Sequence, residues 1–121
     1  FKMFGDDRII LISDSMEATG MPDGEYALGG QKVVKKGNRA TLEDGTIAGS
    51  VTNLMDCLRM AVKMGIPLES AVKCAAVNPA RSVGIYDRYG SITPGKTANL
   101  VLLKEEDLST VQVILKGKAI L

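Results

Sequence analysis

The 121-residue sequence contains no histidine, and this absence restricts its chemistry more than any other feature of composition. A serine or cysteine nucleophile activated by histidine cannot be built within this chain. The common histidine-containing zinc sites are excluded in the same way, so the ligands of any catalytic metal must lie elsewhere. Tryptophan is also absent and only 4% of residues are aromatic, which leaves few surfaces for stacking nucleic acid bases. The net charge of +1 shows no excess of basic residues of the kind that binds nucleic acid.

Long apolar runs and cysteine pairs are scarce as well. No run approaches the ~20 residues of a membrane-spanning helix, and the first residues lack the pattern of a signal peptide. The two cysteines, Cys57 and Cys74, fall in segments with helical patterning, and we expect both to be reduced and structural. The sequence therefore predicts a cytoplasmic protein with neither a membrane nor a nucleic acid partner.

Hydrophobic patterning predicts a mixed α/β chain. The apolar run Ile9–Ile12 is typical of a strand buried on both faces in a parallel sheet. Short strand-like pieces follow, separated by glycine-containing turn signals, at residues 25–28, 31–35 and 39–42. One helix is predicted from Ser50 as N-cap to Gly65, and a second from Pro67 to a break at Asn78-Pro79. The tail is strand-like again at residues 99–103 and 111–115.

A single parallel-type strand cannot form a sheet by itself, so we expect its partners outside this chain or in another copy. A complete (β/α)8 barrel needs about 250 residues. The chain has room for only the last barrel unit and an appended β layer.

The polar residues directly after the apolar run are the first candidate site. Asp14, between Ser13 and Ser15, follows Ile12 closely. A carboxylate at the carboxyl end of a buried parallel strand faces the catalytic mouth of a barrel, where it can act as a general base. The alternative is that Asp14 merely opens a turn, and spacing alone does not separate the two interpretations.

A second pattern is misleading. Residues 90–97 fit the phosphate-binding pattern GxxxxGK[ST], which is meaningful only between a strand and a helix. No buried strand precedes this segment, residues 99–103 continue as a strand, and Pro94 has no N–H to offer a phosphate. We interpret residues 93–95 as a turn, with Lys96 on the surface.

Four stretches together resemble one enzyme family. LISDSMEATGMPDGEY is similar to the segment around the catalytic aspartate of the N-acetylglucosamine-6-phosphate deacetylases, and LEDGTIAGS to the segment before their next helix. AAVNPARSVGI and GSITPGKTANLVLL match motifs that amidohydrolases share more widely. The matches span nearly the whole chain in the family's order. Ser13 and Ser15 depart from it, since Thr and Ala are commoner there.

The resemblance implies an architecture. Residues 1–89 would be the C-terminal part of the metal-dependent hydrolase barrel, comprising its last strand, a β-hairpin excursion and helices. Residues 90–121 would supply the C-terminal strands of a small β-sandwich domain. The remaining strands of both parts would lie outside this chain.

The resemblance also implies an activity, the hydrolysis of N-acetylglucosamine 6-phosphate to glucosamine 6-phosphate and acetate. Asp14 would be the general base on a water activated by a divalent metal ion, zinc or iron, and then the acid for the leaving amine. Ile47, Ala48, Gly49 and Ser50 would contact this amino sugar phosphate, whereas without the resemblance these residues favour an ordinary helix cap. The metal ligands would lie upstream, so this chain alone should be inactive, and the full-length protein should form a homodimer or homotetramer. The alternatives are another metal-dependent amidohydrolase and a non-catalytic β-rich interaction module.

Overall fold

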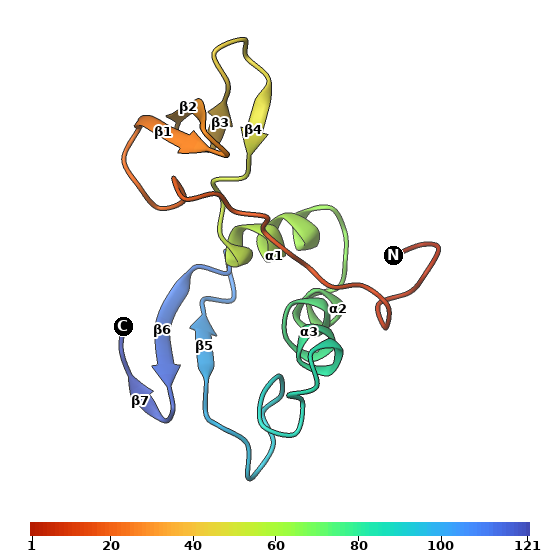
Figure 1. Cartoon of the computed structure of the whole chain (residues 1–121). Coiled ribbons are helices and arrows are strands. Elements are labelled where there is room, and N and C mark those ends of the chain that lie inside the picture. The colour runs from red at the N-terminus through yellow and green to blue at the C-terminus, as the bar shows by residue number, and fades with distance from the viewer. The chain divides into compact units, whose positions relative to one another are not determined.

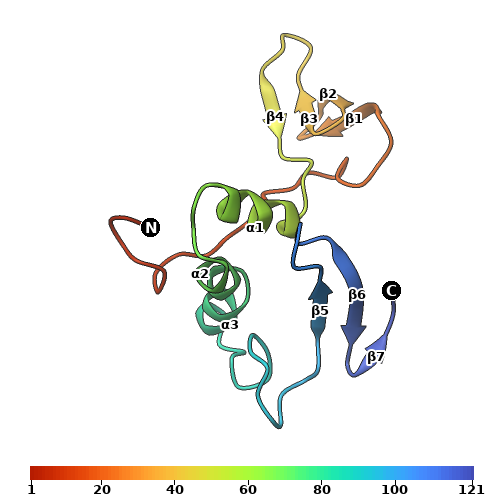
Figure 2. The same cartoon turned by 180° about the vertical axis from the view of Figure 1, so that it is seen from behind.

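Four strands, four helical segments and three further strands follow one another along the chain in the computed structural model, which describes all 121 residues. The strands form two small antiparallel sheets, so the chain is an α/β protein (Figure 1, Figure 2). Backbone contacts divide the chain into two units, residues 11–61 and residues 1–10 with 62–121. No helix combines the length and the apolar character that crossing a membrane requires.

The first unit contains the predicted β-hairpin excursion. Its strands are β1 (Gly24–Leu28), β2 (Gln31–Lys36), β3 (Arg39–Thr41) and β4 (Ile47–Gly49), paired in the order β1-β2-β3-β4. Gly29 and Gly30 both adopt positive φ between β1 and β2, which is the conformation that a tight two-residue hairpin turn requires. Val33 and Ala40 are buried in a small core beneath the sheet, together with Met16, Ala18 and Val51. The hairpin turn predicted at this pair of glycines is thereby confirmed.

Helix α1 (Leu54–Lys63) begins three residues later than predicted. Its N-cap is Asn53, whose side-chain oxygen accepts the Asp56 N–H at 3.0 Å, while the Asp56 carboxylate accepts the Asn53 N–H at 3.2 Å. This reciprocal pair is a capping box. The assignment of the cap to Ser50 was wrong because the Ser50 carbonyl accepts a hydrogen bond from the Met16 N–H at 2.9 Å, which keeps Ser50 in extended pairing.

The second predicted helix does not break at its proline. It runs without interruption through α2 (Leu68–Val72), the π-helical stretch η1 (Lys73–Val77) and α3 (Asn78–Ser82). The Asn78 N–H donates to the Lys73 carbonyl, five residues back. Proline lacks an N–H and crowds the carbonyl four residues back, and the wider π turn accommodates both effects. The chain then leaves the helix at Gly84, which has φ +71°.

One face of this helix holds the N-terminal segment. The Asn78 side-chain amide donates to the carbonyls of Asp6 at 2.6 Å and Ile9 at 2.7 Å. The Asp6 carboxylate accepts hydrogen bonds from Ser70 and Lys73, both at 2.8 Å. These two hydrogen bonds, the one from Lys73 first, hold the pKa of Asp6 below its ordinary value. Asn78 is buried, so the asparagine of the NPA motif has a structural task.

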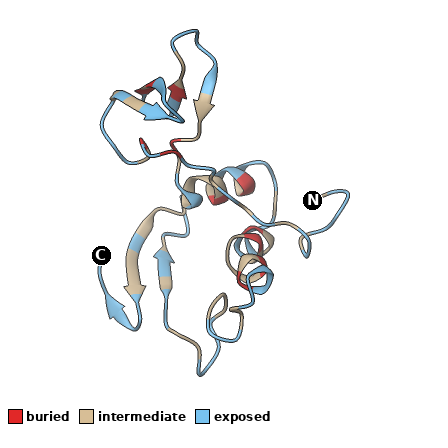
Figure 3. Ribbon diagram, in the orientation of Figure 1, coloured by how far each residue is buried: buried red, intermediate tan, exposed pale blue.

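The second sheet lacks a buried residue. It consists of β5 (Leu100–Leu103), β6 (Thr110–Leu115) and β7 (Lys118–Ala119), paired in that order. Figure 3 shows these strands only in the colours of exposed and half-buried residues. Val101 and Leu102 are adjacent and therefore point to opposite faces, yet they are 49% and 41% exposed. Both faces of the sheet thus present apolar side chains to solvent.

The strand predicted at Ile9–Ile12 is not formed. Ile12 is 72% exposed, and the segment belongs to neither sheet. A strand exists only where a neighbouring strand satisfies its backbone groups, and no strand of this chain pairs with these four residues. Pairing begins just beyond them, at a parallel bridge between Ser15 and Ser50.

Candidate functional site

Asp14 occupies a strained backbone position. Its φ is +50°, in the left-handed region, and only two other non-glycine residues of the chain have positive φ. This conformation costs roughly 1–2 kcal/mol for most side chains, although aspartate tolerates it better than most. Backbone strain of this kind is concentrated at functional sites, where the surroundings hold it in place.

The Asp14 carboxylate is exposed and has no hydrogen-bond or ion-pair partner within the chain. An aspartate that opens a turn normally accepts a hydrogen bond from the backbone N–H two residues later. Asp44 does so with the Thr46 N–H at 2.9 Å, and Asp107 with the Ser109 N–H at 2.8 Å. Because Asp14 makes no such bond, the geometry disfavours the turn-opening interpretation and leaves both carboxylate oxygens available.

The structure joins the segment directly after Asp14 to Ser50, the last of the four residues predicted to contact substrate. The parallel bridge joins Ser15 to Ser50, and the Met16 N–H donates to the Ser50 carbonyl at 2.9 Å. The Thr19 hydroxyl donates to the same carbonyl at 3.4 Å. Two segments that are far apart in the sequence thus lie side by side immediately after Asp14.

The four predicted contact residues differ in what they expose. Ile47 is 77% exposed, so its side chain is available to a ligand. Ala48 packs against the core, which leaves only its backbone. A Cβ added at Gly49 would lie 3.6 Å from the Met16 Cβ, an ordinary contact, so the fold of this chain does not require glycine there. The helix-cap alternative is wrong for these residues, because Ile47–Gly49 is strand β4 and helix α1 starts at Leu54.

Sequence reasoning missed one residue of this region, Thr52. Its carbonyl accepts the Ser15 hydroxyl at 2.6 Å, and its own hydroxyl lies 2.9 Å from the Ser50 hydroxyl. The Thr52 N–H also donates to the Ser50 hydroxyl oxygen, at 3.2 Å. The Ser-Val-Thr spacing is a local signal for this serine turn, because a serine hydroxyl commonly accepts the N–H two residues on.

A metal site is not formed by the residues of this chain. No group of three or more His, Cys, Asp or Glu side chains is placed to hold a metal ion. Ligands for a catalytic metal would therefore have to come from outside this chain.

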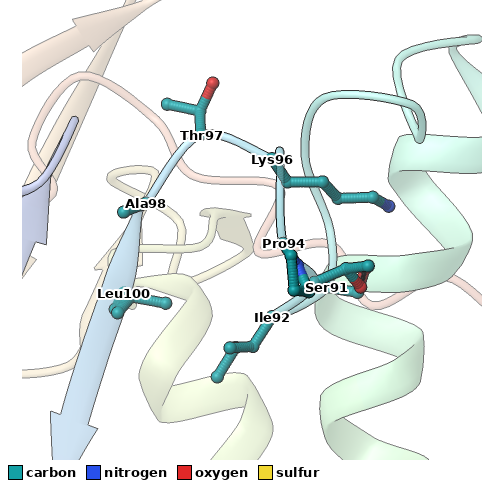
Figure 4. Close-up of a pocket in the computed structure, with 8 residues that line it drawn as sticks. Ser91, Ile92, Pro94, Lys96, Thr97, Ala98 and Leu100 are labelled. Atoms are coloured by element: carbon teal, nitrogen blue, oxygen red, sulfur yellow. Dashed lines mark hydrogen bonds between the residues drawn. The ribbon is translucent and has the colours of Figure 1, made fainter.

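The segment that fits the phosphate-binding pattern lacks the geometry of a phosphate site. Eight residues between Ser91 and Leu100 line a shallow hollow of about 270 Å³, and the segment continues into strand β5, not into a helix (Figure 4). Lys96 extends away from Leu100, and its amine donates to the Tyr86 carbonyl. The same amine lies 3.4 Å from the centre of the Tyr86 ring. Lys96 is thus half-buried in an internal contact, more enclosed than the predicted surface position.

Comparison with known proteins identifies relatives over nearly the whole chain. The amidohydrolase family matches residues 9–120. An N-acetylglucosamine-6-phosphate deacetylase of Bacillus subtilis is 39% identical over 114 residues, which cover 93% of this chain and 28% of that protein. An N-acetylgalactosamine-6-phosphate deacetylase of Escherichia coli O157:H7 is 36% identical over 113 residues, which cover 93% of this chain and 30% of that protein.

The fold has a counterpart among solved structures. An aspartate-to-alanine mutant of N-acetyl-D-glucosamine-6-phosphate deacetylase from Mycobacterium smegmatis, in complex with N-acetyl-D-glucosamine-6-phosphate, matches with a TM-score of 0.86 and 36% identity. The match covers 98% of this chain and 32% of that one. The chain thus spans less than a third of the length of these relatives. Because the family match extends over residues 9–120, the chain belongs to the amidohydrolase family.

Proposed function

We propose that this chain is part of a longer N-acetylglucosamine-6-phosphate deacetylase, which hydrolyses N-acetylglucosamine 6-phosphate to glucosamine 6-phosphate and acetate. The observation that carries the proposal is the state of Asp14. Its backbone is strained, and its carboxylate is exposed and has no partner. The residue after it, Ser15, pairs with Ser50 at the end of β4. The 39% identity to the Bacillus subtilis deacetylase supports the choice of substrate.

In this proposal Asp14 moves the protons. Its carboxylate takes a proton from the attacking water and later returns one to the leaving amine, a role that requires free carboxylate oxygens. Its partner-free side chain meets that requirement. The cofactor is a divalent metal ion, zinc or iron, held by residues outside this chain, and it supplies polarisation of the water and of the amide.

The substrate would lie along the outer side of β4. The exposed Ile47 side chain would contact the sugar or acetyl group, and the backbone groups of Ala48 and Gly49 together with Ser50 would complete the contact. Glycine at position 49 permits a close approach of a ligand to the backbone, and its replacement by alanine costs the local fold little.

The proposed architecture is the end of a (β/α)8 barrel in residues 1–89 and strands of a small β-sandwich in residues 90–121. The exposed apolar run at Ile10 and Ile12 supports barrel strands as neighbours. The two uncovered faces of the β5-β6-β7 sheet support a covering β layer, since sheets bury an apolar face against a second layer. Assembly as a homodimer or homotetramer belongs to the same proposal.

A second substrate is favoured by one comparison. The Escherichia coli O157:H7 relative carries the name of an N-acetylgalactosamine-6-phosphate deacetylase at 36% identity. The two substrates are epimers that differ only in the orientation of one ring hydroxyl. Asp14 would act identically on both, because that hydroxyl takes no part in amide hydrolysis.

Asp14→Asn in the full-length protein tests the role of this residue. Asparagine preserves the shape but cannot exchange protons, so kcat should fall by roughly 10²–10⁴ with KM little changed. Asp44→Asn is the matched control, since Asp44 is an exposed turn residue whose hydrogen bond to Thr46 an asparagine can also accept. Steady-state deacetylation of both epimers at matched metal content is the assay. If Asp14→Asn retains more than about a tenth of the parent activity, Asp14 is not the base.

A further inference from the structure

Two adjacent hydrogen bonds fasten the chain directly after Asp14. One is the backbone bond from the Met16 N–H to the Ser50 carbonyl, at 2.9 Å. The other uses a side chain, the Ser15 hydroxyl, which donates to the Thr52 carbonyl at 2.6 Å. Ser15 is the immediate neighbour of Asp14, so this second bond acts next to the strained residue. The family resemblance assigned Ser15 no role, because alanine is commoner at that position.

The strain at Asp14 has to be held by its surroundings. The Asp14 side chain makes no hydrogen bond or ion pair that could do so, and residues 9–13 before it belong to no strand. The hydrogen bonds that stabilise this conformation are therefore those on the C-terminal side of Asp14, made by the Ser15 side chain and the Met16 backbone. Only the first of these can be removed by substitution without changing the backbone.

The acceptor of the Ser15 hydroxyl is itself fixed. The Thr52 N–H donates to the Ser50 hydroxyl oxygen at 3.2 Å, and the two hydroxyl groups lie 2.9 Å apart. On the other side, Thr52 is followed by Asn53, the N-cap of helix α1. The Thr52 carbonyl is thus oriented both by the serine turn and by the start of the helix, which makes it a rigid anchor.

We propose that Ser15 is a positioning residue, which holds the Asp14 carboxylate in its reactive orientation through the hydrogen bond to the Thr52 carbonyl. This inference rests on the proposed role of Asp14 as general base. Ser15 touches neither the water nor the substrate in this account. It restricts the rotation of the backbone at Asp14, and the efficiency of a general base depends on such orientation.

The test uses the full-length protein with Ser15→Ala and Ser15→Thr. One net hydrogen bond corresponds to a rate factor of roughly 2–12, so Ser15→Ala should lower kcat by that factor and leave KM unchanged. Ser15→Thr keeps the hydroxyl and should restore kcat. Thr19→Val is the matched control, since it removes a longer bond, 3.4 Å, to the Ser50 carbonyl, and it should change kcat less than twofold.

A double-mutant cycle separates positioning from general stability. If Ser15 acts through Asp14, Ser15→Ala should have no further effect on kcat in the Asp14→Asn background. A merely structural role would instead lower the thermal midpoint and leave kcat per folded enzyme unchanged. Unchanged kcat in Ser15→Ala, failure of Ser15→Thr to restore kcat, or additive effects in the cycle would each overturn the proposal.

Different results would show that the proposed deacetylase function, and not the role of Ser15, is wrong. In that case the parent protein deacetylates neither epimer, or Asp14→Asn remains active. Crystal structures of the parent and of Ser15→Ala then still decide the positioning claim. The proposal requires Asp14 to leave the left-handed region, or its carboxylate to take more than one orientation, when the hydroxyl is removed. An Asp14 conformation identical in both structures would refute it.

Discussion

Replacing Asn78 should destabilise the protein more than any exposed asparagine would. Asn78 is buried, and its single amide group donates to the carbonyls of both Asp6 and Ile9. Asn78→Ala removes both hydrogen bonds, each with a net value of about 0.5–1.5 kcal/mol, and leaves two carbonyls without a donor. Asp6 and Ile9 are only half-buried, so water can partly replace the amide. We therefore expect a loss of roughly 1–3 kcal/mol in the free energy of unfolding.

The assay is denaturant unfolding of the full-length protein, with Asn38→Ala as the control. Asn38 is exposed in the hairpin turn between β2 and β3, and its replacement should change stability by less than about 0.5 kcal/mol. Asn78→Asp should be worse than Asn78→Ala at neutral pH, because it sets a carboxylate against two carbonyl oxygens. If Asn78→Ala were as stable as the Asn38→Ala control, the helix would not hold the N-terminal segment and the reasoning would fail.

Two further substitutions follow from the same unit. Gly90→Ala should cost about 1–3 kcal/mol more than Gly95→Ala, because an added Cβ at Gly90 would lie 2.7 Å from the Ala80 Cβ while nothing lies near Gly95. Both glycines have nearly the same positive φ, so equal losses in thermal unfolding would show that the close packing at Gly90 is absent. Asp6→Asn should destabilise the protein at pH 6, and this difference should shrink as the pH falls into the acid range. Hydrogen bonds from Lys73 and Ser70 lower the folded-state pKa of Asp6, so its contribution is present above the unfolded value of about 3.9 and disappears as the pH falls through the folded-state pKa. Thermal midpoints of the parent and the variant should converge at acid pH, and a constant difference would contradict the ion pair.

The sequence predicted local structure well wherever the signal was local. The hairpin turns lie where the sequence predicted them, at residues 29–30 and 37–38. The strands predicted at 25–28 and 31–35 agree with β1 and β2 to within one residue. These succeed because a turn depends on the residues that form it. The helix cap was misplaced because Ser50 and Asn53 are both good capping residues, and pairing with the Ser15 segment removes one of them. The uninterrupted helix was missed because a π turn has no sequence signature that outweighs a proline.

The sequence by itself indicated the family, the β-hairpin excursion and the presence of helices in residues 50–84, and it singled out Asp14 as a candidate base. These depend on residue types and on spacings within a few positions, where propensity and turn chemistry act. Only the tertiary structure decided that Asp14 is strained, and that it lies beside Ser50 through a contact between Ser15 and Thr52 that spans 37 positions. A hydroxyl and a distant carbonyl carry no mutual signal in the sequence. Their meeting depends on how the hairpin excursion returns the chain, and that return is fixed by packing in the small core around Val33 and Ala40.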